Sequence, residues 1–300
     1  MSKSLGYSNK IHIPTYLWVG AIWIVLAEVL LFLRVKPVPS FFTPIVWTGY
    51  ILLVDGLVKA KTGRSLITTR FSLFLIILPW SIITWLVFEG YNLHLRNWQY
   101  FGLPQDLTPR LLGYVWAFAT IIPGVLESAD FVRAFLAPRV RINKWTPGQK
   151  LLSSSILLGT LCLVLPLLMP QRVASYMFAL VWIGFILFLD PILYLLNKPS
   201  ILGDLAKGNT TRLASLLIAG VITGALWEFW NYWAEARWEY TIPYPLSAGP
   251  HYFEMPWLGF FGFIPFAIEL FDLTSLLMLF LDKTGIYSSN KADTQDILSL

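Results

Sequence analysis

The sequence predicts an all-α integral membrane protein with about eight transmembrane helices, arranged as two parallel four-helix repeats around a pseudo-two-fold axis along the membrane normal. Three observations lead to this prediction. The 300 residues have a mean hydropathy of +0.64, and 56% of them are hydrophobic while 13% are charged. Eight stretches contain the roughly 20 mostly apolar residues that a spanning helix needs. Finally, short phrases of the first half recur in order in the second half, which is typical of gene duplication.

The eight predicted spans are separated by short, more polar segments. They cover residues 15–34, 41–58, 70–92, 111–134, 150–169, 173–196, 211–233 and 256–281. The first span is too long for a signal peptide and lacks a small-residue cleavage site, so we expect it to be retained. The chain then divides into a first repeat over 1–134, a basic cytoplasmic linker over 135–150, a second repeat over 151–282 and a polar cytoplasmic tail over 283–300.

The distribution of positive charge predicts the orientation. Cytoplasmic loops of membrane proteins accumulate lysine and arginine. We expect the protein in the cell membrane with both termini in the cytoplasm. In this orientation the inner segments hold sixteen of the 22 lysines and arginines. This placement explains the basic isoelectric point without nucleic acid, and we predict no nucleic-acid partner. The one cysteine, Cys162, lies in an apolar span, which excludes a disulfide framework within this chain.

The duplication is carried by four pairs of matched segments. The phrase VWTGYILLVD (46–55) recurs as VWIGFILFLD (181–190), and six of the ten residues are identical. ITWLVFEGYN (83–92) aligns with ITGALWEFWN (222–231), Trp98-x-Tyr100 with Trp238-x-Tyr240, and Pro123-x-x-x-Glu127-x-x-Asp130 with Pro265-x-x-x-Glu269-x-x-Asp272. Because each repeat contains four spans, both copies enter from the same side, which makes the repeat parallel.

Polar side chains inside the predicted spans are retained in both copies. The matched pairs are Asp55 with Asp190, Glu89 with Glu228, Asn92 with Asn231, Glu127 with Glu269, and Asp130 with Asp272. An ionisable group inside a bilayer is costly and usually faces a partner or a cavity. Depth along the helices sorts these pairs into an outer tier, formed by the glutamate pair Glu89 and Glu228 and the asparagine pair, and an inner tier formed by the other three pairs. Pro123 and Pro265 precede the inner glutamates by four residues and predict a kink beside them.

Each tier has an ordinary structural reading beside the functional one. In the inner tier, Asp55 with Lys59 and Asp130 with Arg133 are spaced for solvated ion pairs one helical turn apart. In the outer tier, Glu89 and Asn92 share one helix face, and no lysine or arginine lies one helical turn from Glu89. Here the structural alternative to a functional site is hydrogen bonding between helices. The candidate site residues are Glu89, Glu228, Asn92, Asn231, Glu127 and Glu269, with the asparagines expected to orient the outer glutamates.

The loop over 234–256 is long, proline-rich and aromatic, and we expect it to cap a pocket on the outer face. The sequence contains no nucleotide-binding glycine motif and no histidine cluster for iron. We therefore predict neither a cofactor nor a metal ion.

One resemblance adds to these patterns. An acidic span end, a Trp-x-Tyr segment and a proline-glutamate span, each present twice, resemble the membrane-bound lycopene cyclases of the fused or heterodimeric type. The residues that carry it are Glu89, Trp98, Tyr100 and Pro123/Glu127, with Glu228, Trp238, Tyr240 and Pro265/Glu269. The resemblance implies duplicated membrane segments and paired glutamates that protonate a polyene.

Three hypotheses of function follow. The first is a membrane protein that binds a lipophilic, isoprenoid- or carotenoid-like molecule between the repeats or acts on it by acid catalysis as a cyclase or isomerase, with membrane lipid around it. The second is a proton-coupled transporter, which duplicated halves and intramembrane acids also suit. The third is an accessory subunit whose polar residues serve assembly alone.

Overall fold

The computed structural model describes residues 13–136 and 140–285. Within these residues lie eight helical spans that are long and apolar enough to cross a membrane. The chain is therefore a multi-pass, all-α membrane protein, as predicted. Six spans are single helices: α1 (Thr15–Phe32), α2 (Val38–Thr62), α3 (Phe71–Leu95), α6 (Gln149–Leu168), α8 (Phe178–Leu195) and α10 (Thr211–Trp233). The other two spans consist of α4 (Leu107–Ala119) with α5 (Ile121–Phe135), and α11 (Trp257–Phe260) with α12 (Phe263–Thr284).

Short elements that the sequence did not predict connect these spans. They are α7 (Gln171–Ala174), α9 (Ile201–Ala206) and the strands β1 (Trp98–Phe101), β2 (Arg237–Tyr240), β3 (His251–Tyr252) and β4 (Met255–Pro256). The helix α7 takes the first residues of the predicted span 173–196, so that this span begins at Phe178.

The two spans that contain Pro123 and Pro265 are interrupted near these prolines, as predicted. Pro123 is the third residue of α5 and Pro265 is the third residue of α12. Proline has no N–H for the carbonyl one turn earlier, so a helix loses a hydrogen bond there. At the first interruption the Ser81 hydroxyl bridges two backbone groups. It donates to the Phe118 carbonyl (2.5 Å) and accepts from the Ile122 N–H (3.0 Å).

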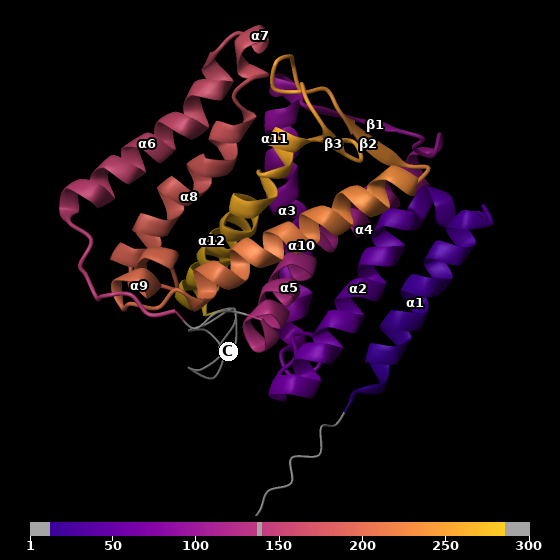
Figure 1. The fold of residues 1–300 in the computed structure, drawn as a ribbon, viewed down its shortest axis with the longest axis horizontal. Coiled ribbons are helices and arrows are strands. Elements are labelled where there is room, and N and C mark those ends of the chain that lie inside the picture. The colour runs from indigo at the N-terminus through magenta and orange to yellow at the C-terminus, as the bar shows by residue number, and fades with distance from the viewer. Residues whose placement is uncertain (1–12, 137–139, 286–300) are drawn as a thin grey trace, which may run out of the picture.

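Two tight helical hairpins form the edges of the molecule, one of α1 with α2 and the other of α6 with α8 (Figure 1). Glycines allow the close approach of the helices in each hairpin. A Cβ on Gly20 would lie 2.5 Å from the Leu53 nitrogen of α2, and a Cβ on Gly159 would lie 2.5 Å from the Phe188 nitrogen of α8. Small residues at such positions let the backbones of membrane helices approach closely.

The helices α3, α5, α10 and α12 lie between the two hairpins (Figure 1). The helix α10 packs against both α5 and α12, while α2 packs on α5 and α8 packs on α12. The largest fully buried side chains come from this centre and include Phe88, Ile122, Leu216 and Phe271. The core thus joins residues of both halves of the chain.

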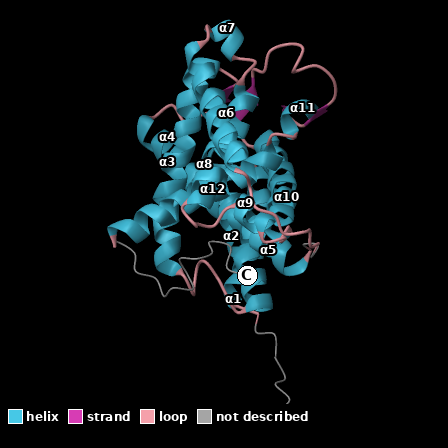
Figure 2. Cartoon of the chain, turned by 90° about the vertical axis from the view of Figure 1, so that its left-hand side faces the viewer, coloured by secondary structure: helices cyan, strands magenta, loops and turns pink. Residues whose placement is uncertain are grey.

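The two ends of the molecule differ. The described chain begins and ends at the lower end of Figure 1, whereas the β1–β2 ribbon and α7 lie at the upper end, an arrangement that Figure 2 shows from the side. In the linker, the Ile142 N–H donates to the Gly208 carbonyl and the Trp145 N–H to the Ala206 carbonyl. The linker residues 137–139 and the tail residues 286–300 lie outside the described part of the chain.

Candidate functional site

The strands β1 and β2 form an antiparallel ribbon that joins the two halves at the upper end. Trp98 pairs with Tyr240 and Tyr100 with Trp238, around a central pair of Gln99 and Glu239. Residues two apart in a strand, and residues directly opposite across a ladder, point to the same face. The four aromatic side chains therefore share one face of the ribbon.

The asparagines Asn92 and Asn231 fix where each strand starts. The Asn92 side chain accepts from the Trp98 N–H (3.2 Å) and donates to the Trp98 carbonyl (2.9 Å). The Asn231 side chain makes the same two bonds with Trp238, at 3.0 and 2.8 Å. The asparagines were expected to orient the glutamates, and this expectation is wrong because their amide groups hold the strand backbone instead.

The outer glutamates lie behind this ribbon and accept hydrogen bonds from its tyrosines. Glu89 Oε1 accepts from the Tyr100 hydroxyl (2.5 Å), and Glu228 Oε1 accepts from the Tyr240 hydroxyl (2.6 Å). The indoles of Trp85 (2.8 Å) and Trp98 (3.2 Å) also donate to Glu89 Oε1.

The two glutamates differ in how completely they are satisfied. Glu228 is fully buried, and its Oε2 has no hydrogen-bond partner. Its counterpart Glu89 is half-buried and receives three donors on one oxygen. No lysine or arginine forms an ion pair with either glutamate within the described residues.

Both tyrosines of the ribbon remain protonated near neutral pH. Burial raises the pKa of Tyr100 and of Tyr240 well above its usual value, and the neighbouring Glu89 or Glu228 raises it further. Each phenol is therefore a hydrogen-bond donor at the end of a short Tyr–Glu pair.

An aromatic cavity opens on the face of the ribbon that carries the four aromatic side chains. It encloses about 1200 Å³, its open mouth included. Its walls come from both halves of the chain and include Trp47, Trp85, Phe88, Trp98, Tyr100, Tyr114, Phe178, Trp182, Trp227, Trp238, Tyr240 and Phe266. Neither Glu89 nor Glu228 lines it. The two tyrosine side chains thus contact both a carboxyl group and a cavity whose aromatic lining suits a lipophilic ligand.

The loop over 234–256 contributes to this cavity through β2 and Met255. This agrees with the expectation that the loop caps a pocket. Trp98, Tyr100, Trp238 and Tyr240 were not among the candidate site residues of the sequence, although aromatic residues next to a span are usual anchors in the membrane interface. Their repetition in both halves was the signal that could have marked them as site residues, since anchoring alone does not require matched positions.

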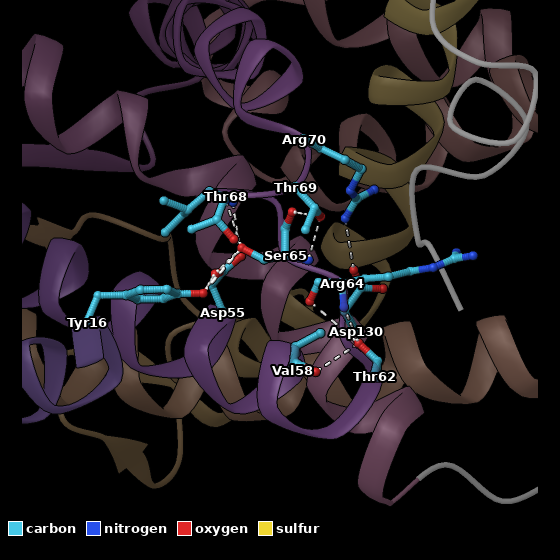
Figure 3. A network of polar contacts seen from close by, with 11 residues as sticks. Tyr16, Asp55, Val58, Thr62, Arg64, Ser65, Thr68, Thr69, Arg70 and Asp130 are labelled. Carbon is cyan, nitrogen blue, oxygen red and sulfur yellow. Dashed lines mark hydrogen bonds and ion pairs between the residues drawn. The ribbon is translucent and has the colours of Figure 1, made fainter. Parts of the chain in front are cut away.

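The inner tier forms a separate polar region in each half, and Figure 3 shows that of the first half. In the first half, Asp55 Oδ2 accepts from the Tyr16 hydroxyl (2.5 Å) and the Ser65 hydroxyl (2.6 Å), and Oδ1 accepts from the Ile67 N–H (3.1 Å). The expected pairing with Lys59 is wrong, because the Lys59 ammonium donates to Thr68 (2.8 Å) while Asp55 is fully buried.

The second aspartate of that region is equally far from solvent. Asp130 is 2% exposed and lies 3.7 Å from the guanidinium of Arg70. This burial contradicts the solvated setting expected for Asp130. Glu127 is also buried, with Asp55, Asp130 and Arg70 as its charged neighbours.

The inner tier of the second half has fewer partners. Asp190 accepts from the backbone N–H groups of Ile201 (2.5 Å) and Leu202 (2.9 Å). Glu269 and Asp272 are fully buried in α12, and no donor reaches the carboxyl oxygens of either. The Asp272 carboxyl group lies beside that of Asp190, with Arg212 as a charged neighbour. Neither Glu127 nor Glu269 lines the aromatic cavity, and both lie within their spans rather than at the ends.

The described residues contain no group of three or more His, Cys, Asp or Glu side chains that could hold a metal ion. No known protein family, curated protein or solved structure matches the chain. The fold and the site therefore carry the functional argument.

Proposed function

We propose that this protein binds a lipophilic, isoprenoid-like molecule in the aromatic cavity between its two halves and acts on it by proton transfer. The cavity carries this proposal, because its walls are aromatic and two Tyr–Glu pairs reach it through Tyr100 and Tyr240. An apolar pocket with a few convergent polar groups is the usual form of a small-molecule site.

The two pairs suit a reaction that returns the proton it uses. One tyrosine hydroxyl would give its proton to a carbon–carbon double bond and take a replacement from its glutamic acid. The opposite pair would accept a proton from a neighbouring carbon, which leaves a shifted double bond or a ring. Aromatic faces stabilise a positive charge that develops between these steps. This chemistry agrees with the resemblance to membrane lycopene cyclases.

We further propose that the halves are parallel repeats, one over 1–134 and the other over 151–282, with the linker and the tail in the cytoplasm of a cell membrane. Matched contacts support the repeats. They are the glycine contacts of the two edge hairpins, the interruptions before Pro123 and Pro265, the symmetric β1–β2 pairing, and the backbone donors on Asp55 and Asp190. The excess of lysine and arginine in the inner segments supports the orientation.

A variant with both outer glutamates replaced, Glu89→Gln with Glu228→Gln, tests the catalytic part of the proposal. Each amide keeps the shape and can still accept a bond from tyrosine, but it cannot release a proton. Chromatography of polyenes and isoprenoids from the source cells measures the effect. The variant should change this profile as much as deletion of the gene does, while the purified variant stays folded. A wild-type profile in cells that carry the variant would contradict acid catalysis and favour assembly as the role of these residues.

A proton-coupled transporter is the second candidate. It is favoured by Glu269, which is fully buried without a hydrogen-bond partner, and by Asp272, which is fully buried beside Asp190. Such carboxyl groups are typical of proton relays in membrane transporters. Uptake of a substrate into vesicles that collapses with an uncoupler and with Glu269→Gln, but not with Glu89→Gln, would support this function over the first.

A further inference from the structure

The charged residues that line the aromatic cavity are all positively charged. Among the described residues that line it, the charged ones are Arg110 and Arg237, and no carboxylate is present. Both arginines come from the end of the molecule where the ribbon lies. Arg110 belongs to the first turns of α4, and Arg237 begins β2. The cavity thus has an aromatic interior and a positively charged mouth.

The two arginines are not equivalent. Arg237 forms an ion pair with Glu239 (2.7 Å), which offsets its charge. Arg110 donates from Nε to the Pro104 carbonyl and from Nη2 to the Gln105 carbonyl, both at 2.8 Å. These carbonyls hold the guanidinium in place and leave its positive charge without a carboxylate partner. The carboxyl group nearest in sequence, that of Asp106, makes no ion pair with it.

A second polar group of the cavity wall lacks a partner. The hydroxyl oxygen of Thr43, on the second turn of α2, is buried and makes no hydrogen bond. A buried hydroxyl without a hydrogen-bond partner destabilises the protein, and a hydrogen bond to an acceptor on a bound ligand recovers this free energy. Arg110 and Thr43 therefore both offer donors to an acceptor on a ligand in the cavity.

From this arrangement we infer that the ligand is an amphiphile, with a prenyl- or acyl-type body among the aromatic rings and an anionic head group, carboxylate or phosphate, bound by Arg110. The inference rests on the proposed function, since it assumes a ligand in the cavity. Guanidinium groups bind both kinds of oxyanion in a bidentate manner. A neutral polyene would fill the same walls but would leave the guanidinium charge unpaired.

The test compares retinol with retinoic acid, which share one polyene and differ in the head group. Binding to the purified protein in neutral detergent is followed by quenching of tryptophan emission, because Trp47, Trp85 and Trp227 line the cavity. Wild-type protein should bind retinoic acid about tenfold more tightly than retinol, the effect of one charge-assisted hydrogen bond. Arg110→Gln should abolish this preference by weakening retinoic acid binding about tenfold, whereas Arg110→Lys should keep most of it.

Arg172→Gln is the matched control, since Arg172 is an exposed arginine in α7 at the same end and does not line the cavity. It should leave both affinities unchanged. Competition with bound retinoic acid tests whether the head group can be a phosphate. A site that accepts phosphate should lose its retinoic acid to geranylgeranyl phosphate but not to geranylgeraniol, whereas a site that accepts only carboxylate should keep it with both competitors.

The outcomes separate this inference from the proposed function. Equal binding of retinol and retinoic acid, unchanged in Arg110→Gln, overturns the anionic head group and leaves a lipophilic site intact. Binding of no retinoid and no prenyl compound overturns the lipophilic site and the inference with it.

Discussion

At the scale of single residues, the two Tyr–Glu pairs have the same geometry but different support. Glu89 keeps the indole donors of Trp85 and Trp98 if Tyr100 loses its hydroxyl. Among the described residues, Tyr240 is the one side chain that donates to Glu228. Tyr240 also accepts from the Trp238 indole (2.8 Å), so its hydroxyl satisfies two buried groups. The second pair is therefore the more sensitive to substitution.

We predict that Tyr240→Phe destabilises the protein by about 1–3 kcal/mol, the cost of leaving buried polar groups without partners. Tyr100→Phe should cost about half as much, because two donors to Glu89 remain. Thermal unfolding of both purified variants in the same neutral detergent measures this difference. Equal losses, or a larger loss for Tyr100→Phe, would contradict the assignment of partners.

At the scale of helices, close contact within each hairpin depends on a glycine. We predict that Gly20→Ala and Gly159→Ala each destabilise the protein by about 1–3 kcal/mol, because the added methyl group meets the backbone of the facing helix. Gly90→Ala is the control, since a Cβ there meets nothing within 4 Å. It should be neutral or stabilise by up to about 1 kcal/mol through helix propensity. Unfolding midpoints of the three variants decide the point, and a loss in Gly90→Ala as large as in the others would count against the hairpin packing.

The helices were the part of the fold that the sequence predicted best. Apolar length located all eight spans, and the prolines located the interruptions, because both signals are local in the chain. The hydrogen-bond partners were mostly not predictable. Tyr100 reaches Glu89 because a loop returns onto the helix that precedes it, and β1 meets β2 from a distance of 140 residues in the sequence. Asp55 likewise takes partners from α1 and from the loop after α2 rather than the lysine one turn away.

At the scale of the whole molecule, the fold places the described chain ends opposite the ribbon (Figure 1). With Cys162→Ser as the background, we predict that Gln105→Cys and Ala248→Cys react with a membrane-impermeant maleimide on intact cells. Lys144→Cys and Lys207→Cys should react only after the cells are permeabilised, because the positive-inside rule puts these residues in the cytoplasm. The opposite pattern would reverse the orientation and move the cavity to the cytoplasmic half of the membrane.

The central claim is that the aromatic cavity holds a lipophilic molecule, and native mass spectrometry of the protein, extracted in a neutral detergent, tests it most directly. Gly113 lines the cavity, and a Cβ there touches only the Phe41 ring, at 3.6 Å, so Gly113→Phe should fill the space that a ligand needs. Gly90→Phe adds the same side chain at a position outside the cavity. We predict one bound lipophile in the wild-type protein and in Gly90→Phe, and none in Gly113→Phe. A ligand retained equally in Gly113→Phe, or absent from all three proteins, would contradict the claim.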